Sequence, residues 1–206
     1  MPRRDASWIS PTAHYTGFVW YDRGWSHDSL ATWQGRALYY GLAPWVQASS
    51  VMLGGVTLRK LLLQRHAVID HLLDRAIESG RVGQIVEIAC GLSPRGWRMM
   101  GRHGASGLRY VEADLPDMAA RKEAVLAGAG MRQEGHHVIA LDAMAEGALE
   151  EQVLPLLDPT KGLAIVTEGL VNYFPRGAVE GMWGRFASFL EGFPEGVYLS
   201  DLHVAD

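Results

Sequence analysis

The sequence is short of several features by which protein classes are recognised. Its 206 residues contain one cysteine, Cys90, which excludes an internal disulfide and any metal site built from several cysteines. A lone cysteine is typical of a reducing compartment, and we expect a cytoplasmic protein. No stretch approaches the roughly 20 apolar residues that a membrane-spanning helix needs. The basic start of the chain is not followed by the apolar segment of a signal peptide.

An excess of positive charge is also missing. The formal net charge is -4 and the isoelectric point is about 6.1, so the chain has no field that would attract nucleic acid or an anionic membrane. We therefore expect a small-molecule partner, with no nucleic acid and no membrane. A hydrophobic content of 48% is enough to bury a core, and the length predicts a single compact unit.

Two glycine motifs of nucleotide and ester chemistry are absent. G-x-G-x-x-G fails because Ser93 stands where its second glycine would be, and the G-x-S-x-G elbow fails because Arg95 follows Pro94. The first absence disfavours a nicotinamide-dependent oxidoreductase, and the second disfavours a serine hydrolase.

What the chain does contain is an aromatic N-terminal region followed by helical patterns. Residues 1–26 are rich in aromatics and turn formers without a sustained period, which predicts an irregular arm. Helices are expected over 30–43, where Pro44 discourages continuation, and over 45–54. Thr57 is a good N-cap for a third helix, which ends at Gly80. Residues 1–56 are interpreted as an N-terminal arm and helical lid, or as plain packing against a sheet.

From residue 57 to 206 the pattern alternates between strands and helices, which we interpret as one domain. Short apolar runs predict strands over 84–89, 108–113, 138–141, 163–167 and 197–202. Helices should begin near Pro94, Pro116, Glu146 and Pro175, each with a proline or an acid in the first turn. The alternation predicts an α/β fold with a Rossmann-like, doubly wound, mostly parallel sheet.

Ligands of such sheets bind beyond the carboxyl ends of the strands, so the residues that leave each strand are the site candidates. They are Cys90-Gly91-Leu92, Asp114, Asp142, Glu168 and Asp201. Carboxylates at four of the five exits point to a ligand rich in hydroxyl and amine donors, or to a cation.

Three of the residues near these exits have specific expectations and alternatives. Gly91 allows the backbone to approach a ligand, and an ordinary tight strand-to-helix turn is the alternative. Asp114 follows 23 residues later, near the ~20-residue offset of acids that bind a ribose diol, or it caps the helix near Pro116. Glu87 lies inside an apolar strand and needs a donor, either a ligand amine or a nearby backbone group.

At these residues the chain resembles the leucine carboxyl methyltransferase family, in particular its bacterial branch with polyketide O-methyltransferases of the tetracenomycin type. The matching segments run in family order over roughly residues 57–203. They are Leu61-Leu62-Leu63-Gln64-Arg65-His66, Val86-Glu87-Ile88-Ala89-Cys90-Gly91-Leu92-Ser93, Tyr110-Val111-Glu112-Ala113-Asp114-Leu115-Pro116, Leu141-Asp142 and Thr167-Glu168-Gly169-Leu170-Val171-Asn172-Tyr173-Phe174.

The resemblance implies that S-adenosylmethionine is the cofactor and that nine residues bind it. Arg65 would pair with the methionyl carboxylate, unless it is a solvated residue of its helix. The amino-acid portion of the cofactor would be lined by Glu87, Ala89 and Gly91, with Glu168 facing the methionine end. The remaining four residues, which would hold the ribose and lie by the adenine, are Asp114, Leu115, Asp142 and Ala143.

The implied activity is an O-methyltransferase that acts on a hydroxyl or carboxyl of a small, polyketide-like or carboxylic acid acceptor. A phenol or alcohol acceptor would benefit from a general base, for which Tyr173 and His203 are candidates, although a structural role is the favoured interpretation of both. The pair His136-His137 suggests a metal, but adjacent side chains point apart in a strand and no third ligand is placed, so we expect none.

The resemblance also implies a seven-stranded sheet, of which the last two strands are missing from this sequence. A shortened chain, or a partner subunit that completes the sheet edge as a homodimer, would account for this. The alternative function is that of a catalytically weak or inactive cofactor-binding relative with a regulatory or oligomerisation role.

Overall fold

The computed structural model describes residues 9–52 and 57–201. The chain divides into two compact units: residues 1–67 with 91–94 form the first, and residues 68–90 with 95–206 form the second. The division falls inside helix α4 (Leu58–Glu78). Within the residues described, no helix is both long and apolar enough to cross a membrane.

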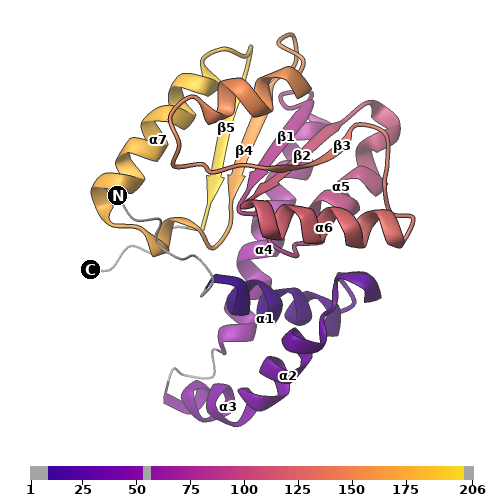
Figure 1. Ribbon diagram of the computed structural model, residues 1–206, viewed down its shortest axis with the longest axis vertical. Coiled ribbons are helices and arrows are strands. Elements are labelled where there is room, and N and C mark those ends of the chain that lie inside the picture. The colour runs from indigo at the N-terminus through magenta and orange to yellow at the C-terminus, as the bar shows by residue number, and fades with distance from the viewer. Residues whose placement is uncertain (1–8, 53–56, 202–206) are drawn as a thin grey trace. The chain divides into compact units, whose positions relative to one another are not determined.

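The second unit is built on a five-stranded parallel sheet, which confirms the predicted α/β fold (Figure 1). Its order is β3-β2-β1-β4-β5, so the chain reverses its direction of winding between β1 and β4. The strands are β1 (Gln84–Ile88), β2 (Arg109–Asp114), β3 (His136–Ala140), β4 (Leu163–Thr167) and β5 (Gly196–Ser200). In the register of the sheet, Ile88 is level with both Ala113 and Thr167, which brings the carboxyl ends of the three central strands to one edge.

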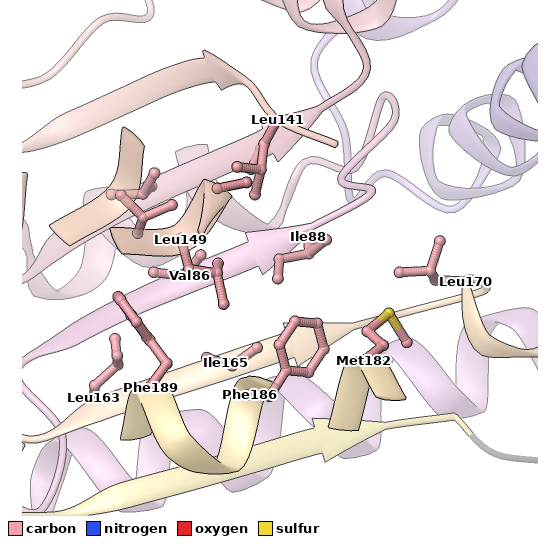
Figure 2. Packing of buried hydrophobic residues seen from close by; sticks show 14 of the residues in the cluster. Val86, Ile88, Leu141, Leu149, Leu163, Ile165, Leu170, Met182, Phe186 and Phe189 are labelled. Carbon is pink, nitrogen blue, oxygen red and sulfur yellow. The ribbon is translucent and has the colours of Figure 1, made fainter. Parts of the chain in front are cut away.

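Helices cover both faces of this sheet because successive strand residues point to opposite sides. On one face, Ile85 packs with residues of α4 and of α5 (Arg95–His103). On the other, Val86 and Ile88 pack against α7 (Arg176–Leu190), whose apolar side chains point at the strands in Figure 2. Helix α6 (Pro116–Gly128) contacts β2 and β3. A parallel sheet covered in this way has strands that are apolar on both sides, which explains the continuous runs in the sequence.

The first unit begins with a helix that the sequence pattern does not predict. Helix α1 (Ile9–Asp22) replaces the expected irregular arm, because residues 14–20 are all buried. A helix buried on every side has no polar face and therefore no 3.6-residue period to detect. The prediction of an irregular arm over this segment was wrong.

The other two helices of the first unit agree better with expectation. Helix α2 (Trp33–Gly41) is capped by Thr32, whose hydroxyl accepts a hydrogen bond from the Gly35 N–H. Helix α3 (Ala43–Met52) follows after one residue, with Pro44 in its first turn, where the missing N–H has no cost. The predicted N-cap of α4 is confirmed, since the Thr57 hydroxyl accepts from the Lys60 N–H.

One predicted helix of the second unit is wrong. The segment near Glu146 forms a π-helical turn, η4 (Leu149–Val153), followed by a 3-10 turn, η5 (Leu154–Leu156), instead of an α-helix. Pro155 lies inside the second turn, where an α-helix would lose a backbone hydrogen bond. The strand expected at 197–202 ends at Ser200, and Leu202 lies outside the residues described.

Candidate functional site

The carboxyl ends of β1, β2 and β3 meet at one edge of the sheet in the second unit. The Leu141 N–H donates to the carbonyl of Asp114 at 2.8 Å, so Asp142 directly follows a residue bonded to the β2 exit. The Cys90 N–H donates to the carbonyl of Ala113 at 3.2 Å, so the residues that follow β1 are hydrogen-bonded to the end of β2. Three predicted cofactor residues, Ala89, Asp114 and Asp142, therefore lie on neighbouring turns.

Ala89, the residue that follows β1, has an unusual backbone conformation. Its φ of 56° is in the left-handed region, and no other residue that is not glycine has a positive φ in the described part of the chain. This conformation costs an L-residue about 1–2 kcal/mol. Strained turns of this kind cluster at functional sites, and this one lies at the end of β1, where the sequence analysis predicts ligand binding.

The next residue, Cys90, carries the only thiol of the chain and is buried. Burial raises the pKa of this thiol well above its ordinary value, although the nearby ammonium of Lys122 acts in the opposite direction. The group is therefore a neutral thiol and not a reactive thiolate.

The two aspartates at this edge are held by local backbone bonds. The Asp114 carboxylate accepts from the Leu115 N–H at 2.8 Å, and the N-cap position of α6 is Leu115, so Asp114 is not the N-cap residue of that helix. The exposed Asp142 accepts from the Met144 N–H at 2.9 Å, which forms an Asx turn. Leu115 itself is 38% exposed and places an apolar side chain beside Asp114.

A cluster of buried charges lies beside the same strand ends, with Arg95 at its centre. Its Nε is 2.7 Å from Asp70 Oδ1, its Nη1 is 2.6 Å from Glu87 Oε1 and its Nη2 is 2.5 Å from Glu168 Oε2. The side chain of Arg95 is fully buried, and those of the three acids are at most 8% exposed. The acids come from α4, from β1 and from the turn after β4, so one guanidinium joins three elements.

The charges in this cluster stabilise one another. Burial by itself would lower the pKa of Arg95, but the carboxylates of Glu87 and Glu168 outweigh it and hold that pKa well above its usual value. Tyr110 donates its hydroxyl to Glu87 Oε2 at 2.8 Å, and its own pKa is raised by burial and then by the Glu87 charge. The guanidinium of Arg95 therefore stays charged in this buried site.

The cluster answers the question that the sequence raises about Glu87. The expectation that this buried carboxylate has donor partners is confirmed, and the donors that the structure shows are the side chains of Arg95 and Tyr110. Sequence reasoning missed Arg95, Tyr110 and Asp70. The signal that was available was the buried acid itself, because a carboxylate in an apolar strand requires a cation or a hydroxyl from elsewhere in the chain.

The remaining predicted residues have the following places in the chain. Arg65 and Gly91 belong to the first unit; Arg65 is half-buried on α4, and Gly91 has a φ of 51°. Tyr173 is half-buried at the end of a 3-10 turn, η6 (Val171–Tyr173), and the Ala143 carbonyl accepts from Arg185. His203 lies outside the residues that the structure describes.

A second buried ion cluster joins β2, β3 and α6. Lys122 Nζ is 2.7 Å from Glu112 Oε1, and His136 Nε2 is 3.1 Å from Glu112 Oε2. His136 is thus bonded to a carboxylate that is already paired with a lysine. No group of three or more possible metal ligands occurs in residues 9–52 and 57–201.

Known proteins with the same fold include methyltransferase relatives. At a TM-score of 0.58 and 14% identity, 91% of this chain matches 64% of a candidate methyltransferase from Thermobifida fusca YX. At a TM-score of 0.60 and 12% identity, 89% of it matches 64% of a DUF574 family protein from Streptomyces avermitilis MA-4680. The chain thus spans just under two thirds of either relative, and at these identities the likeness concerns the fold.

The sequence itself gives the family. No curated protein matches the chain. The model of the leucine carboxyl methyltransferase family matches residues 45–186, which is more than half of the 206 residues. The matched region contains every predicted cofactor residue, from Arg65 to Glu168. The chain belongs to the leucine carboxyl methyltransferase family.

Proposed function

We propose that this protein is an S-adenosylmethionine-dependent O-methyltransferase that acts on a hydroxyl or carboxyl of a small, polyketide-like or carboxylic acid acceptor. The observation that supports this most is the meeting, at one sheet edge, of the strained Ala89 turn with the carboxylate of Asp114. A turn that brings the backbone close to a ligand, next to an acid that can accept from two hydroxyls, suits a nucleoside.

The residues present fit the proposed cofactor chemically. Asp114 would accept from the ribose hydroxyls, and the exposed apolar side chain of Leu115 would pack against the adenine, with Asp142 and Ala143 beside it. The small side chain of Ala89 leaves room at the β1 exit, and the negative charges of Glu87 and Glu168 suit the amino group of the methionyl part. Arg65 and Gly91 stay predictions from the resemblance.

The sulfonium group of the cofactor, when bound, supplies a methyl group that is already activated for in-line displacement. The residues of this chain then have to bind both partners, align the acceptor oxygen and exclude water. A carboxylate acceptor needs no general base. For a phenol or alcohol we propose Tyr173 or His203 as the group that takes the proton.

We also propose that the enzyme works in the cytoplasm, where the thiol of Cys90 stays reduced.

A homodimer through a sheet edge is proposed as well. In the described part of the chain, β5 pairs with β4 on one side and with no strand on the other. Its outer backbone groups can pair with a second copy, which would cover the edge.

The cofactor part of the proposal is tested by calorimetry with S-adenosylhomocysteine. The wild-type protein should bind this ligand, and Asp114→Asn should weaken binding about tenfold or more, because charged hydrogen bonds to the ribose are lost. Asp117→Asn is the matched control, since this exposed acid lies in the first turn of α6, and it should leave the affinity unchanged. Folded wild-type protein that binds neither S-adenosylmethionine nor S-adenosylhomocysteine would refute the function.

Transfer itself is tested by following methyl incorporation into a panel of small phenols and carboxylic acids. Methylation of either class would support the activity and identify the acceptor chemistry. Binding of S-adenosylmethionine without transfer to any member of a broad panel would favour a cofactor-binding relative with a regulatory role.

A further inference from the structure

Arg95 occupies a position in the second unit that packing alone does not require. The guanidinium donates in three directions, to Asp70 on α4, Glu87 on β1 and Glu168 after β4. Only arginine has donors spread over a rigid plane in this way; a lysine offers one compact charge. The geometry therefore fixes two carboxylates, Glu87 and Glu168, relative to each other across neighbouring strands.

Carboxylates are the commonest groups in this cluster. Three carboxylates share the guanidinium of Arg95, and Arg98, which is 24% exposed, adds a second cation 2.9 Å from Asp70. The side chains of the three acids are at most 8% exposed, so the carboxylates lie where water is largely excluded. An additional cationic group would be stabilised there, because an opposite charge within a few ångströms favours ionised carboxylates.

We propose that Arg95 is a positioning residue that holds Glu87 and Glu168 where they receive the ammonium group of the methyl donor. This inference rests on the proposed function. Arg95 itself touches no part of the cofactor in this scheme. It acts through the two acids, which it keeps oriented, and the ammonium becomes a further cationic partner of these acids when it binds.

The test compares two ligands that differ in the amino-acid part. S-adenosylhomocysteine carries the ammonium group, whereas 5′-methylthioadenosine has the same nucleoside without it. In Arg95→Lys the positive charge is kept, but the three-way contact is lost. We expect the Kd for S-adenosylhomocysteine to rise about tenfold or more, and the Kd for 5′-methylthioadenosine to change less than about twofold. Calorimetry on the full chain measures both.

Arg102→Lys is the matched control. Arg102 lies on the same helix and pairs with Asp74, an acid outside the cluster, at 3.0 Å. This variant should bind both ligands like the wild type. If Arg95→Lys does not fold, Glu168→Gln replaces it, because it removes one charge with little change in shape, and the same selective loss is expected.

The possible outcomes separate this inference from the proposed function. Equal weakening of both ligands would show a general disturbance of the fold and would overturn the positioning role. Unchanged affinity for both ligands in Arg95→Lys would overturn it as well. If the wild-type protein binds neither ligand, it is the proposed function that fails.

Discussion

Gly96 shows how closely single residues are fitted around the β1 exit. It lies in the first turn of α5, and a Cβ added there would be 2.5 Å from Glu112 Oε1 and 2.8 Å from His136 Nε2. The Glu112 carboxylate cannot move aside easily, because it is buried and paired with Lys122. This glycine therefore sets the distance between α5 and β2.

We expect Gly96→Ala to lower the free energy of unfolding by about 1–3 kcal/mol, as overpacking does in buried sites. Gly101→Ala, in the same helix, is the control: nothing lies within 4 Å of the added Cβ, so the substitution should stabilise by up to about 1 kcal/mol. Urea unfolding of both variants measures the difference. Equal midpoints for the two variants would contradict the packing around Gly96.

Individual site residues could be predicted from the sequence only where chain order determines their place. Ala89, Asp114 and Asp142 follow strands, and parallel strands put their exits on one edge, so their proximity followed from the pattern. Arg95 follows no such rule. Its partners lie 25 residues before it on α4 and 73 residues after it beyond β4, and only the folded chain brings them together.

At the level of elements, the Glu112 and Lys122 pair ties β2 to α6 through a buried ion pair. Burial would raise the pKa of Glu112, but the Lys122 charge and the His136 contact outweigh it, so that pKa is lowered. Lys122 behaves in the complementary way: burial opposes its charge, while the Glu112 carboxylate helps to hold its pKa above the usual value.

The pair should make stability depend on pH at the acid end. Because the pKa of Glu112 is lower in the folded than in the unfolded chain, its contribution is complete above the unfolded value of about 4.3 and is lost as the pH falls through the folded value. The free energy of unfolding of Glu112→Gln should therefore fall less steeply than that of the wild type, by up to about 1.4 kcal/mol per pH unit.

Urea unfolding at several pH values from roughly 3 to 7 measures this slope. Glu180→Gln is the control, since Glu180 is an exposed acid paired with Arg176 on the surface of α7, and it should keep the wild-type slope. A wild-type slope in Glu112→Gln would show that Glu112 does not titrate as the structure implies.

An element could be predicted from the sequence where its burial leaves a regular hydrophobic period. The strands and surface helices have such a period, and α1 has none. The five strands and α4 have apolar residues at periods set by their burial, and the expected and observed ranges agree to within two residues over the described part of each. Residues 14–20 of helix α1 are buried on all sides, and the turn at 149–156 depends on a π-helical bond pattern that has no simple sequence period.

At the scale of the whole molecule, the free edge of β5 should determine how copies of the chain associate. We expect sedimentation velocity to show a concentration-dependent dimer, because among the described residues β5 pairs with β4 alone and its other side can offer backbone groups to a second copy. A monomer at all accessible concentrations would contradict the proposed homodimer. The C-terminal residues 202–206 belong in the protein used for this experiment.

The buried Cys90 gives the second unit an internal reporter. Because the chain has one thiol, which is buried and whose pKa is raised, a thiol reagent can modify the native protein only when the β1 exit opens. The rate of alkylation then reports how often the Cys90 thiol becomes exposed at the strand end where the cofactor is proposed to bind. Cysteines introduced on the surface for spectroscopic labels can also be modified selectively, without removal of the native one.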